Sequence, residues 1–156
     1  MSASQEQIRG CQTGGQCAVS GVVEAHKDAV YTLCLRALGD AERAEDLAEK
    51  VFLAAHQAII RLDPETDLLH WLLSLAIERV TEPRAASTSG DEIAVVNTVL
   101  SELEPPFRMA VILRDVLLLD ESAVAEILDI PLGTARSRIH RGRLTMARSL
   151  VEKVGE

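Results

Sequence analysis

The chain has 156 residues, 47% of them hydrophobic, and a formal net charge of −8. This length and apolar content indicate a globular chain with one ordinary domain or two very small ones. No apolar run approaches the roughly 18 residues of a membrane span, and the polar start MSASQEQIRG lacks the apolar core of a signal peptide, so we expect a cytoplasmic protein without a membrane span.

The composition favours helices. Aromatic residues make up only 3% of the chain, while Ala, Leu, Val and Ile are abundant. We therefore predict an all-α fold. The three cysteines are an odd number in a chain that is expected to stay in the cytoplasm, so a disulfide framework is not expected.

The first half of the chain predicts an arm and three helices. Residues 1–18 are rich in Gly, Gln and Ser without periodicity, which predicts a flexible N-terminal arm. Apolar spacings of three and four predict helices over 19–38 and 41–62, with Asp40 as the N-cap of the second. A third helix is predicted over 65–80, after Asp63-Pro64.

The segment TEPRAASTSGDE is the best linker candidate, because it combines Pro and Gly with small polar residues. We place a flexible linker at 83–92, between a first domain over 19–82 and a second over 93–156. The second domain is predicted to contain four helices, over 93–103, over 105–118, from the N-cap Asp120 to 130, and from Gly133-Thr134 to about 153.

Positive charge gathers near the end of the chain. Residues 1–106 hold 8 basic and 17 acidic side chains, whereas residues 130–149 hold five arginines and no Asp or Glu. The helix near 120–128, the short turn at 129–132 and the helix from about 134 form a helix-turn-helix pattern, whose second helix can lie in the major groove of DNA. A solvated arginine-rich face is the alternative interpretation.

The segment LSELEPPFRMAVILRDVLLLDESAVAEILDIPLGTARSRIHRGRLTMARSL resembles region 4 of the extracytoplasmic-function (ECF) bacterial sigma factors. LGDAERAEDLAEKVFLAAHQAI, followed by WLLSLA, resembles region 2 of the same family in the right order, so the resemblance covers about residues 22–152. It implies two small helical domains and no catalytic residues, hence no enzyme. It also implies binding to core RNA polymerase through region 2 and to the upstream promoter element through region 4.

The resemblance assigns candidate residues to both tasks. Five residues match the DNA-recognition helix, and Arg143 joins them from the arginine stripe, giving Thr134, Arg136, Ser137, Arg138, Arg141 and Arg143. Four residues match the polymerase-binding segment, and Glu49 stands there where the family tends to have Gln, giving Glu45, Asp46, Leu47, Glu49 and Phe52. An ordinary amphipathic helix with acids near its N-terminus is the alternative for this segment.

Region 2 departs from the family after Trp71-Leu72. The family usually has basic or aromatic residues and an Asn there, whereas this chain has Ile77 and Glu78. Displaced single strands are held by positive charge and aromatic stacking, so strand opening becomes questionable. Alternatives to a working sigma factor are a sigma-like module that acts as an anti-sigma decoy or mimic, and a stand-alone helix-turn-helix regulator. An anti-sigma factor is left open as a further partner.

The remaining motifs indicate no further chemistry. No paired general acid and base, nucleophile triad, phosphate loop or metal quartet is found, so no cofactor and no metal are predicted. Cys11 and Cys17, with His26, would allow a metal or redox site, but their spacing is wider than that of paired zinc cysteines. Two incidental thiols in a disordered arm are the simpler interpretation.

Overall fold

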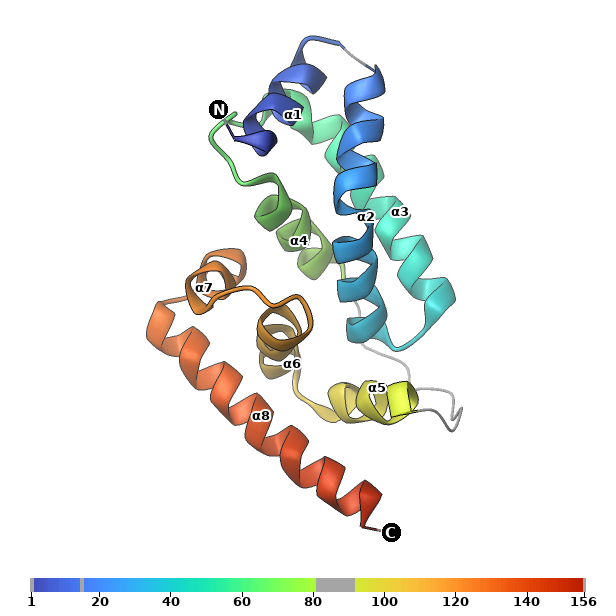
Figure 1. Ribbon diagram of the computed structural model, residues 1–156, viewed down its shortest axis with the longest axis vertical. Coiled ribbons are helices and arrows are strands. Elements are labelled where there is room, and N and C mark those ends of the chain that lie inside the picture. The colour runs from blue at the N-terminus through green and yellow to red at the C-terminus, as the bar shows by residue number, and fades with distance from the viewer. Residues whose placement is uncertain (1, 15, 81–91, 156) are drawn as a thin grey trace.

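The computed structural model describes residues 2–14, 16–80 and 92–155, including all of their side chains except those of 16–18 and 92–94. Within these ranges every regular element is a helix and no strand occurs (Figure 1). The predicted all-α fold is therefore confirmed. No helix in the described part of the chain combines the length and the hydropathy needed to cross a membrane.

The predicted flexible arm is wrong for residues 3–12, which form helix α1 (Ala3–Gln12). Ser2 and Gln5 close a capping box, in which the Gln5 amide donates to Ser2 Oγ and the Ser2 amide donates to Gln5 Oε1. Ile8 and Cys11 are buried against the rest of the domain. Only these two positions form the buried apolar face of α1, and two positions are too few to show a helical apolar periodicity in the sequence.

Three longer helices complete the first domain. They are α2 (Gln16–Leu38), α3 (Ala41–Ala58), which continues into the 3-10 turn η1 (Ile59–Arg61), and α4 (Leu68–Arg79). Gly39, with φ +70°, allows the chain to reverse between α2 and α3. The predicted cap is confirmed, because Asp40 accepts a hydrogen bond from the Arg43 amide at 3.1 Å.

Helix α4 begins three residues later than the sequence predicted. Asp63 accepts a hydrogen bond from the Glu65 amide, which holds the chain in a turn. Asp67 then accepts one from the His70 amide at 3.1 Å and acts as the N-cap of α4.

The second domain contains the remaining helices. They are α5 (Glu92–Glu102), α6 (Pro105–Val111), the π-helical turn η2 (Ile112–Val116), α7 (Glu121–Leu128) and α8 (Leu132–Val154). The prediction of one α-helix over 105–118 is wrong beyond Val111, because the helix widens into η2 and the backbone of Leu118 takes φ +58°. Asp120 caps α7 as predicted, by accepting from the Ala123 amide at 2.8 Å.

Arg108 of α6 is buried and holds the end of α5. Its guanidinium donates hydrogen bonds to the carbonyls of Leu100, Ser101 and Leu103 at 2.9, 3.3 and 2.6 Å. These carbonyls lie at the C-terminal end of α5, where a helix leaves its last acceptors without partners. Arg108 is thus a structural residue, although its neighbours in sequence are apolar.

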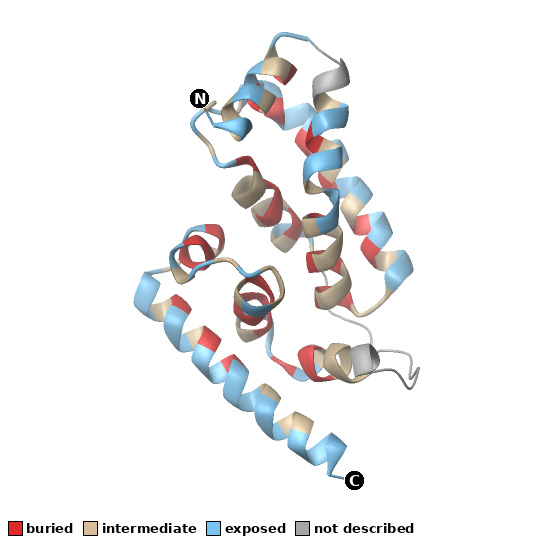
Figure 2. Ribbon diagram, viewed as in Figure 1, coloured by how far each residue is buried: buried red, intermediate tan, exposed pale blue. Residues whose placement is uncertain are grey.

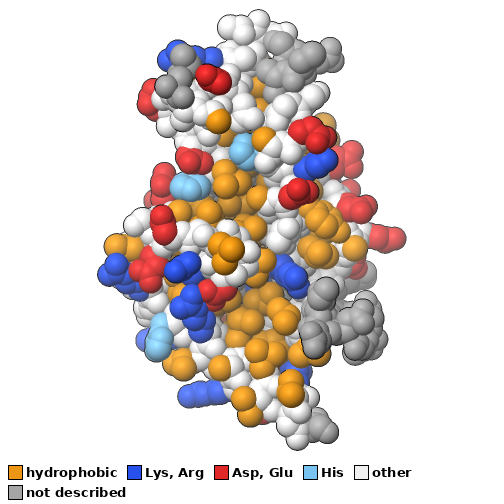
Figure 3. All heavy atoms as spheres, in the orientation of Figure 1, with side chains coloured by type: hydrophobic (Ala, Val, Ile, Leu, Met, Phe, Trp, Pro, Cys, Tyr) orange, Lys and Arg blue, Asp and Glu red, His pale blue; other side chains and the backbone are white. Residues whose placement is uncertain are grey.

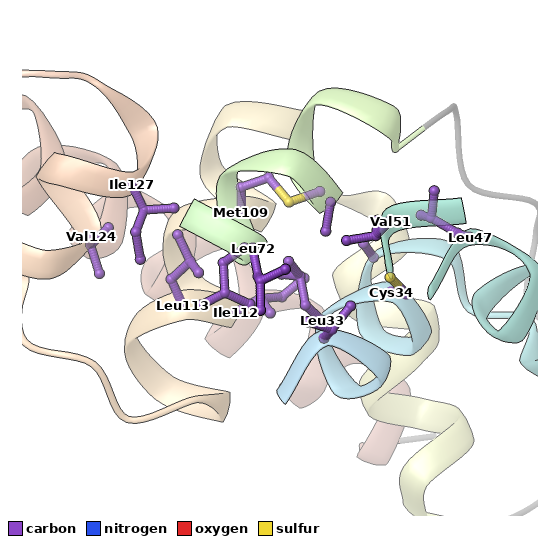
Figure 4. Packing of buried hydrophobic residues seen from close by; sticks show 14 of the residues in the cluster. Leu33, Cys34, Leu47, Val51, Leu72, Met109, Ile112, Leu113, Val124 and Ile127 are labelled. Carbon is purple, nitrogen blue, oxygen red and sulfur yellow. The ribbon is translucent and has the colours of Figure 1, made fainter. Parts of the chain in front are cut away.

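The two domains pack against each other. Helix α7 lies beside α4, and α5 lies below the end of α2 (Figure 1). Red, buried residues gather on the facing sides of the helices in Figure 2. In Figure 4, Leu33 and Leu72 of the first domain belong to the same buried cluster as Ile112 and Leu113 of the second. The predicted linker lies outside the described residues, except that Glu92 begins α5.

Candidate functional site

The predicted helix-turn-helix is formed by α7 and α8. Asp129 ends α7 with φ +53°, and its amide donates to the Glu126 carbonyl. The Ile130 amide donates to the Ala125 carbonyl at 3.0 Å, which closes the end of α7. Helix α8 then starts at Leu132, about two residues earlier than predicted.

Buried side chains fix α8 against its domain. Ala135 and Ile139 are buried, and Gly142 lies so close to α6 that a Cβ there would be 2.5 Å from Val111 Cγ2. Leu144, further along the helix, is 47% exposed. The arginines lie mainly on the remaining, outward face of the helix.

Two of the four candidate arginines are held by carboxylates of the same domain. Arg136 Nε donates to Glu121 Oε2 at 2.6 Å, and Arg143 pairs with Asp115. The hydrogen bond with Asp115 raises the pKa of Arg143, while slight burial opposes this shift. Both arginines are at least half exposed, so these ion pairs contribute little stability and can be exchanged for phosphate.

The other two arginines have no acidic partner within the described part of the chain. Arg138 is half-buried and Arg141 is exposed, and neither forms an ion pair there. Ser137 is exposed and Thr134 is half-buried on the same helix. These residues therefore form a cationic and polar surface near the N-terminal half of α8.

Only some amides in the first turn of α8 lack a backbone acceptor. The amide of Ala135 donates to the Pro131 carbonyl at 3.0 Å, so it is not free for a phosphate. The amides of Gly133 and Thr134 belong to the first turn of α8, where a helix lacks internal acceptors.

The polymerase-binding candidates on α3 divide between two faces. Glu45, Glu49 and Phe52 border a groove between α2 and α3, together with Tyr31 and Ala48. Figure 3 shows hydrophobic side chains gathered over these helices, with acidic side chains at their edge. Asp28 and Lys27 also line the groove, which thus combines an apolar floor with a rim of three acidic side chains and one lysine.

Asp46 and Leu47 face the other side of α3. Asp46 pairs with Lys50 at 2.8 Å, and Leu47 is only 7% exposed. Leu47 therefore acts as a core residue. Tyr31 is one of the groove residues that the sequence did not indicate, because its position beside α3 follows only from how α2 and α3 pack.

The face of α4 that departs from the family carries little positive charge. Glu78 is exposed and Ile77 is half-buried. At the other end of α4, Trp71 and Ser74 line a pocket with Glu126 and Ile127 of α7. The Ser74 hydroxyl donates to the His70 carbonyl of its own helix at 2.9 Å and lies 3.3 Å from the Ile127 carbonyl of α7. His70 Nδ1 lies 3.3 Å from Glu126 Oε2.

The buried cysteines are not arranged for chemistry. Burial raises the pKa of Cys34 to about 12 and also raises that of Cys11, so both thiols stay protonated. The side chain of Cys17 lies outside the described residues. Among the residues described, no group of three or more His, Cys, Asp or Glu side chains is close enough to hold a metal ion.

Comparison with known proteins matches both domains to one family. The family model for sigma-70 region 2 matches residues 22–82, and the model for sigma-70 region 4 matches residues 93–146. The ECF RNA polymerase sigma factor SigW of Bacillus subtilis is 30% identical, over 94% of this chain and 96% of its own length.

Solved structures share the fold. CnrH, in its complex with the cytosolic domain of CnrY, superposes with a TM-score of 0.86 and 22% identity, over 96% of this chain and 97% of CnrH. The sigma factor RpoE, in its complex with the anti-sigma factor NepR from Bartonella quintana, superposes with a TM-score of 0.70 and 17% identity, over 82% of this chain and 93% of RpoE. The match to both regions and the extent of the identity to SigW show that this chain belongs to the ECF sigma factors and acts in transcription initiation.

Proposed function

We propose that α8 reads the upstream promoter element, with Arg138 and Arg141 as its main contacts. The observation that supports this most directly is that both cations lie on the recognition helix without an acidic partner among the described side chains. Arginine can pair with guanine edges or with phosphates, and the exposed Ser137 can donate to either. Arg136 and Arg143 would join after releasing Glu121 and Asp115.

The groove between α2 and α3 is the proposed docking surface for core RNA polymerase. Its apolar floor at Tyr31 and Phe52 can bury a helix of the partner, while Glu45 and Glu49 select a basic one. Leu47 supports this surface from the core, and Asp46 lies outside the groove on the other side of α3. In this role the chain is a regulatory protein rather than an enzyme, and it would act in the cytoplasm.

An anti-sigma factor is a further proposed partner. RpoE, which shares the fold of this chain, was solved in complex with the anti-sigma factor NepR. Such a partner would compete with polymerase if it occupied the groove between α2 and α3.

Strand opening is the part of initiation that this chain supports least. The exposed Glu78 on α4 repels phosphates, and few aromatic side chains are available for stacking. We therefore expect transcription to be more efficient from pre-opened promoter templates than from duplex ones.

Pull-down with core polymerase, followed by transcription from a library of promoter fragments, tests these assignments. Arg138→Ala with Arg141→Ala should lower promoter affinity about tenfold or more, whereas Arg148→Ala, an exposed arginine further along α8, should have little effect. Glu45→Lys with Glu49→Lys should abolish polymerase binding, and Glu65→Lys should not. Wild-type protein that fails to bind polymerase would refute the docking surface.

A further inference from the structure

Glu121 is placed to control one arginine of the recognition helix. It is the first residue of α7, directly after the N-cap Asp120, and its carboxylate accepts a hydrogen bond from Arg136 Nε at 2.6 Å. Arg136 lies near the start of α8, so the ion pair joins the two helices of the helix-turn-helix. On the left of Figure 3, basic and acidic side chains lie side by side over these helices. Arg136 therefore meets DNA with a carboxylate already bound to it.

The ion pair between Glu121 and Arg136 is weak enough to be exchanged. The Arg136 side chain is 61% exposed and that of Glu121 is 40% exposed, and exposed ion pairs contribute little free energy. Glu121 holds Arg136 through one hydrogen bond, whereas Asp115 holds Arg143 through two, from Nε and Nη2. Arg136 is therefore the paired arginine that DNA releases more easily.

Glu121 stays beside the recognition helix after Arg136 has been released. Its charge also acts on Arg143, because it adds to the rise in the pKa of Arg143 that the hydrogen bond with Asp115 chiefly causes. A carboxylate that has lost its partner beside DNA repels the phosphates. The release of Arg136 thus costs free energy in every complex with DNA, whatever the base sequence.

This cost separates two kinds of DNA contact. A phosphate would only replace the carboxylate as the anionic partner of Arg136, so the exchange gains little and leaves Glu121 unpaired. A guanine offers two acceptors, N7 and O6, and a bidentate pair with arginine favours the correct base by about fivefold to 150-fold. We propose that Glu121 is a specificity-determining residue, which suppresses phosphate contacts of Arg136 and leaves it to pair with a guanine in register.

Arg138 and Arg141 escape this control. Neither has an acidic partner among the described side chains, so both can bind phosphates or bases without releasing a carboxylate. Glu121 would therefore lower the affinity for DNA of unrelated sequence more than the affinity for the promoter. This inference rests on the proposed function, because it requires α8 to contact DNA.

The test compares the binding of the full chain to two labelled duplexes over a range of NaCl concentrations. One duplex has a random sequence, and the other is selected from a random pool by the wild-type protein. The variants are Glu121→Gln, Arg136→Gln and the combination of both. Gln has nearly the shape of Glu and Asp120 still caps α7, so Glu121→Gln should stay folded, which far-UV circular dichroism checks.

Glu102→Gln is the matched control. Glu102 also pairs with a cation of α8, Lys153, at 2.9 Å, and its side chain is 44% exposed. Both replacements remove one negative charge and release one cation of α8. Lys153 belongs to the last turn of α8, roughly 25 Å along the helix from Arg136. A difference between the two variants thus reports on the position of the carboxylate and not on net charge.

On the random duplex, Glu121→Gln should raise affinity about threefold to tenfold above that of Glu102→Gln. It should also make the slope of log affinity against log salt steeper by about 1, because Arg136 becomes free to contact a phosphate. On the selected duplex the gain should be smaller, so the ratio of the two affinities falls. Arg136→Gln alone should leave the slope on the random duplex unchanged, whereas in the combined variant it should cancel the steeper slope.

Three results would overturn the proposal. The first is that Glu121→Gln and Glu102→Gln act alike on the random duplex. The second is that Arg136→Gln alone already lowers the slope on this duplex, because Arg136 would then contact phosphate in spite of Glu121. The third is that Glu121→Gln weakens binding to the selected duplex, since Glu121 would then position Arg136 for its base rather than restrain it.

Failure of this inference is distinguishable from failure of the proposed function. Arg138→Ala with Arg141→Ala should lose affinity for both duplexes whether or not Glu121 acts on Arg136. If this double variant keeps full affinity, α8 does not contact DNA and both proposals fail. If it loses affinity while Glu121→Gln behaves like Glu102→Gln, only the role of Glu121 is wrong.

Discussion

At the scale of single residues, Leu118 combines an unfavourable backbone with an exposed side chain. Its φ is +58°, in the left-handed region, and its side chain is 77% exposed. A side chain with a Cβ costs about 1–2 kcal/mol in this region, and Asn tolerates it better than Leu. Leu118→Asn should therefore raise the free energy of unfolding by about 1 kcal/mol, measured by urea denaturation.

The control for this prediction is Leu53→Asn on α3. Leu53 is 60% exposed in a regular helix, so the same replacement should lower stability by a few tenths of a kcal/mol through helix propensity. A loss of stability in both variants would mean that Leu118 makes contacts that outweigh its strain.

His26 gives the stability of the first domain a pH dependence. It is half-buried beside Gln7 of α1, and burial lowers the pKa of His26 below its ordinary value, with Asp67 partly opposing the shift. The folded state thus binds fewer protons than the unfolded state as the pH falls through 6.5, and stability is lost in that range. Above that pH, His26 is neutral in both the folded and the unfolded state, and the folded state keeps its full stability.

His26→Gln should remove this contribution. The difference in unfolding free energy between wild type and variant should be constant above about pH 7.5. Below pH 6.5, the unfolding free energy of wild type should fall relative to that of the variant. Chemical denaturation of both proteins from pH 5 to 8 provides the measurement. A difference that does not change with pH would show that His26 titrates normally in the folded chain.

The candidate DNA contacts show how far a sequence predicts single residues. The positions of Arg136, Arg138, Arg141 and Arg143 on one helix follow from spacing and from the turn before them. The carboxylates that pair with them cannot be predicted from this spacing, because Glu121 lies 15 residues before Arg136 and Asp115 lies 28 residues before Arg143. Only the folded domain distinguishes the paired arginines from Arg138 and Arg141.

At the scale of the elements, helices with a cap and a wide apolar face were predicted well. Helices α3 and α7 have both, with Asp40 and Asp120 as caps. Helix α1 was missed because only Ile8 and Cys11 mark its buried face. The π-helical turn η2 was missed because its hydrogen bonds span five residues, a spacing that leaves no distinct apolar pattern.

The packing of α8 on α6 depends on the missing side chain of Gly142. A Cβ there would lie 2.5 Å from Val111 Cγ2 and 3.3 Å from the Phe107 carbonyl oxygen, and Val111 is buried and stiff. Gly142→Ala should lower the free energy of unfolding by about 1–3 kcal/mol, despite the better helix propensity of Ala.

Gly133→Ala is the matched control on the same helix. Nothing lies within 4 Å of a Cβ at Gly133, so this replacement should leave stability unchanged or raise it by up to about 1 kcal/mol. Thermal denaturation of both variants separates the two cases. Equal effects would show that α6 and α8 adjust to the added methyl group.

At the scale of the whole molecule, the two domains share one apolar cluster. The apolar periodicity of the sequence predicts each domain. It does not predict the contact between them, because the apolar faces that meet there are equally compatible with two separate cores. Leu72 of α4 and Ile112 of η2 are both fully buried in the shared cluster. Polar contacts accompany it, including the hydrogen bond from Arg36 Nη1 to Asn97 Oδ1 at 2.7 Å.

A shared core predicts a single unfolding transition. Trp71 is the only tryptophan and lines the pocket between α4 and α7, so its fluorescence reports on the first domain and its contact with the second. Far-UV circular dichroism reports on all helices, and both probes should give the same midpoint in urea. Arg36→Ala leaves Asn97 without its charged partner and should lower both midpoints together, by about 1 kcal/mol in free energy. If Trp71 fluorescence and circular dichroism separate into two transitions, the domains unfold independently and the contact between α4 and α7 contributes little to stability.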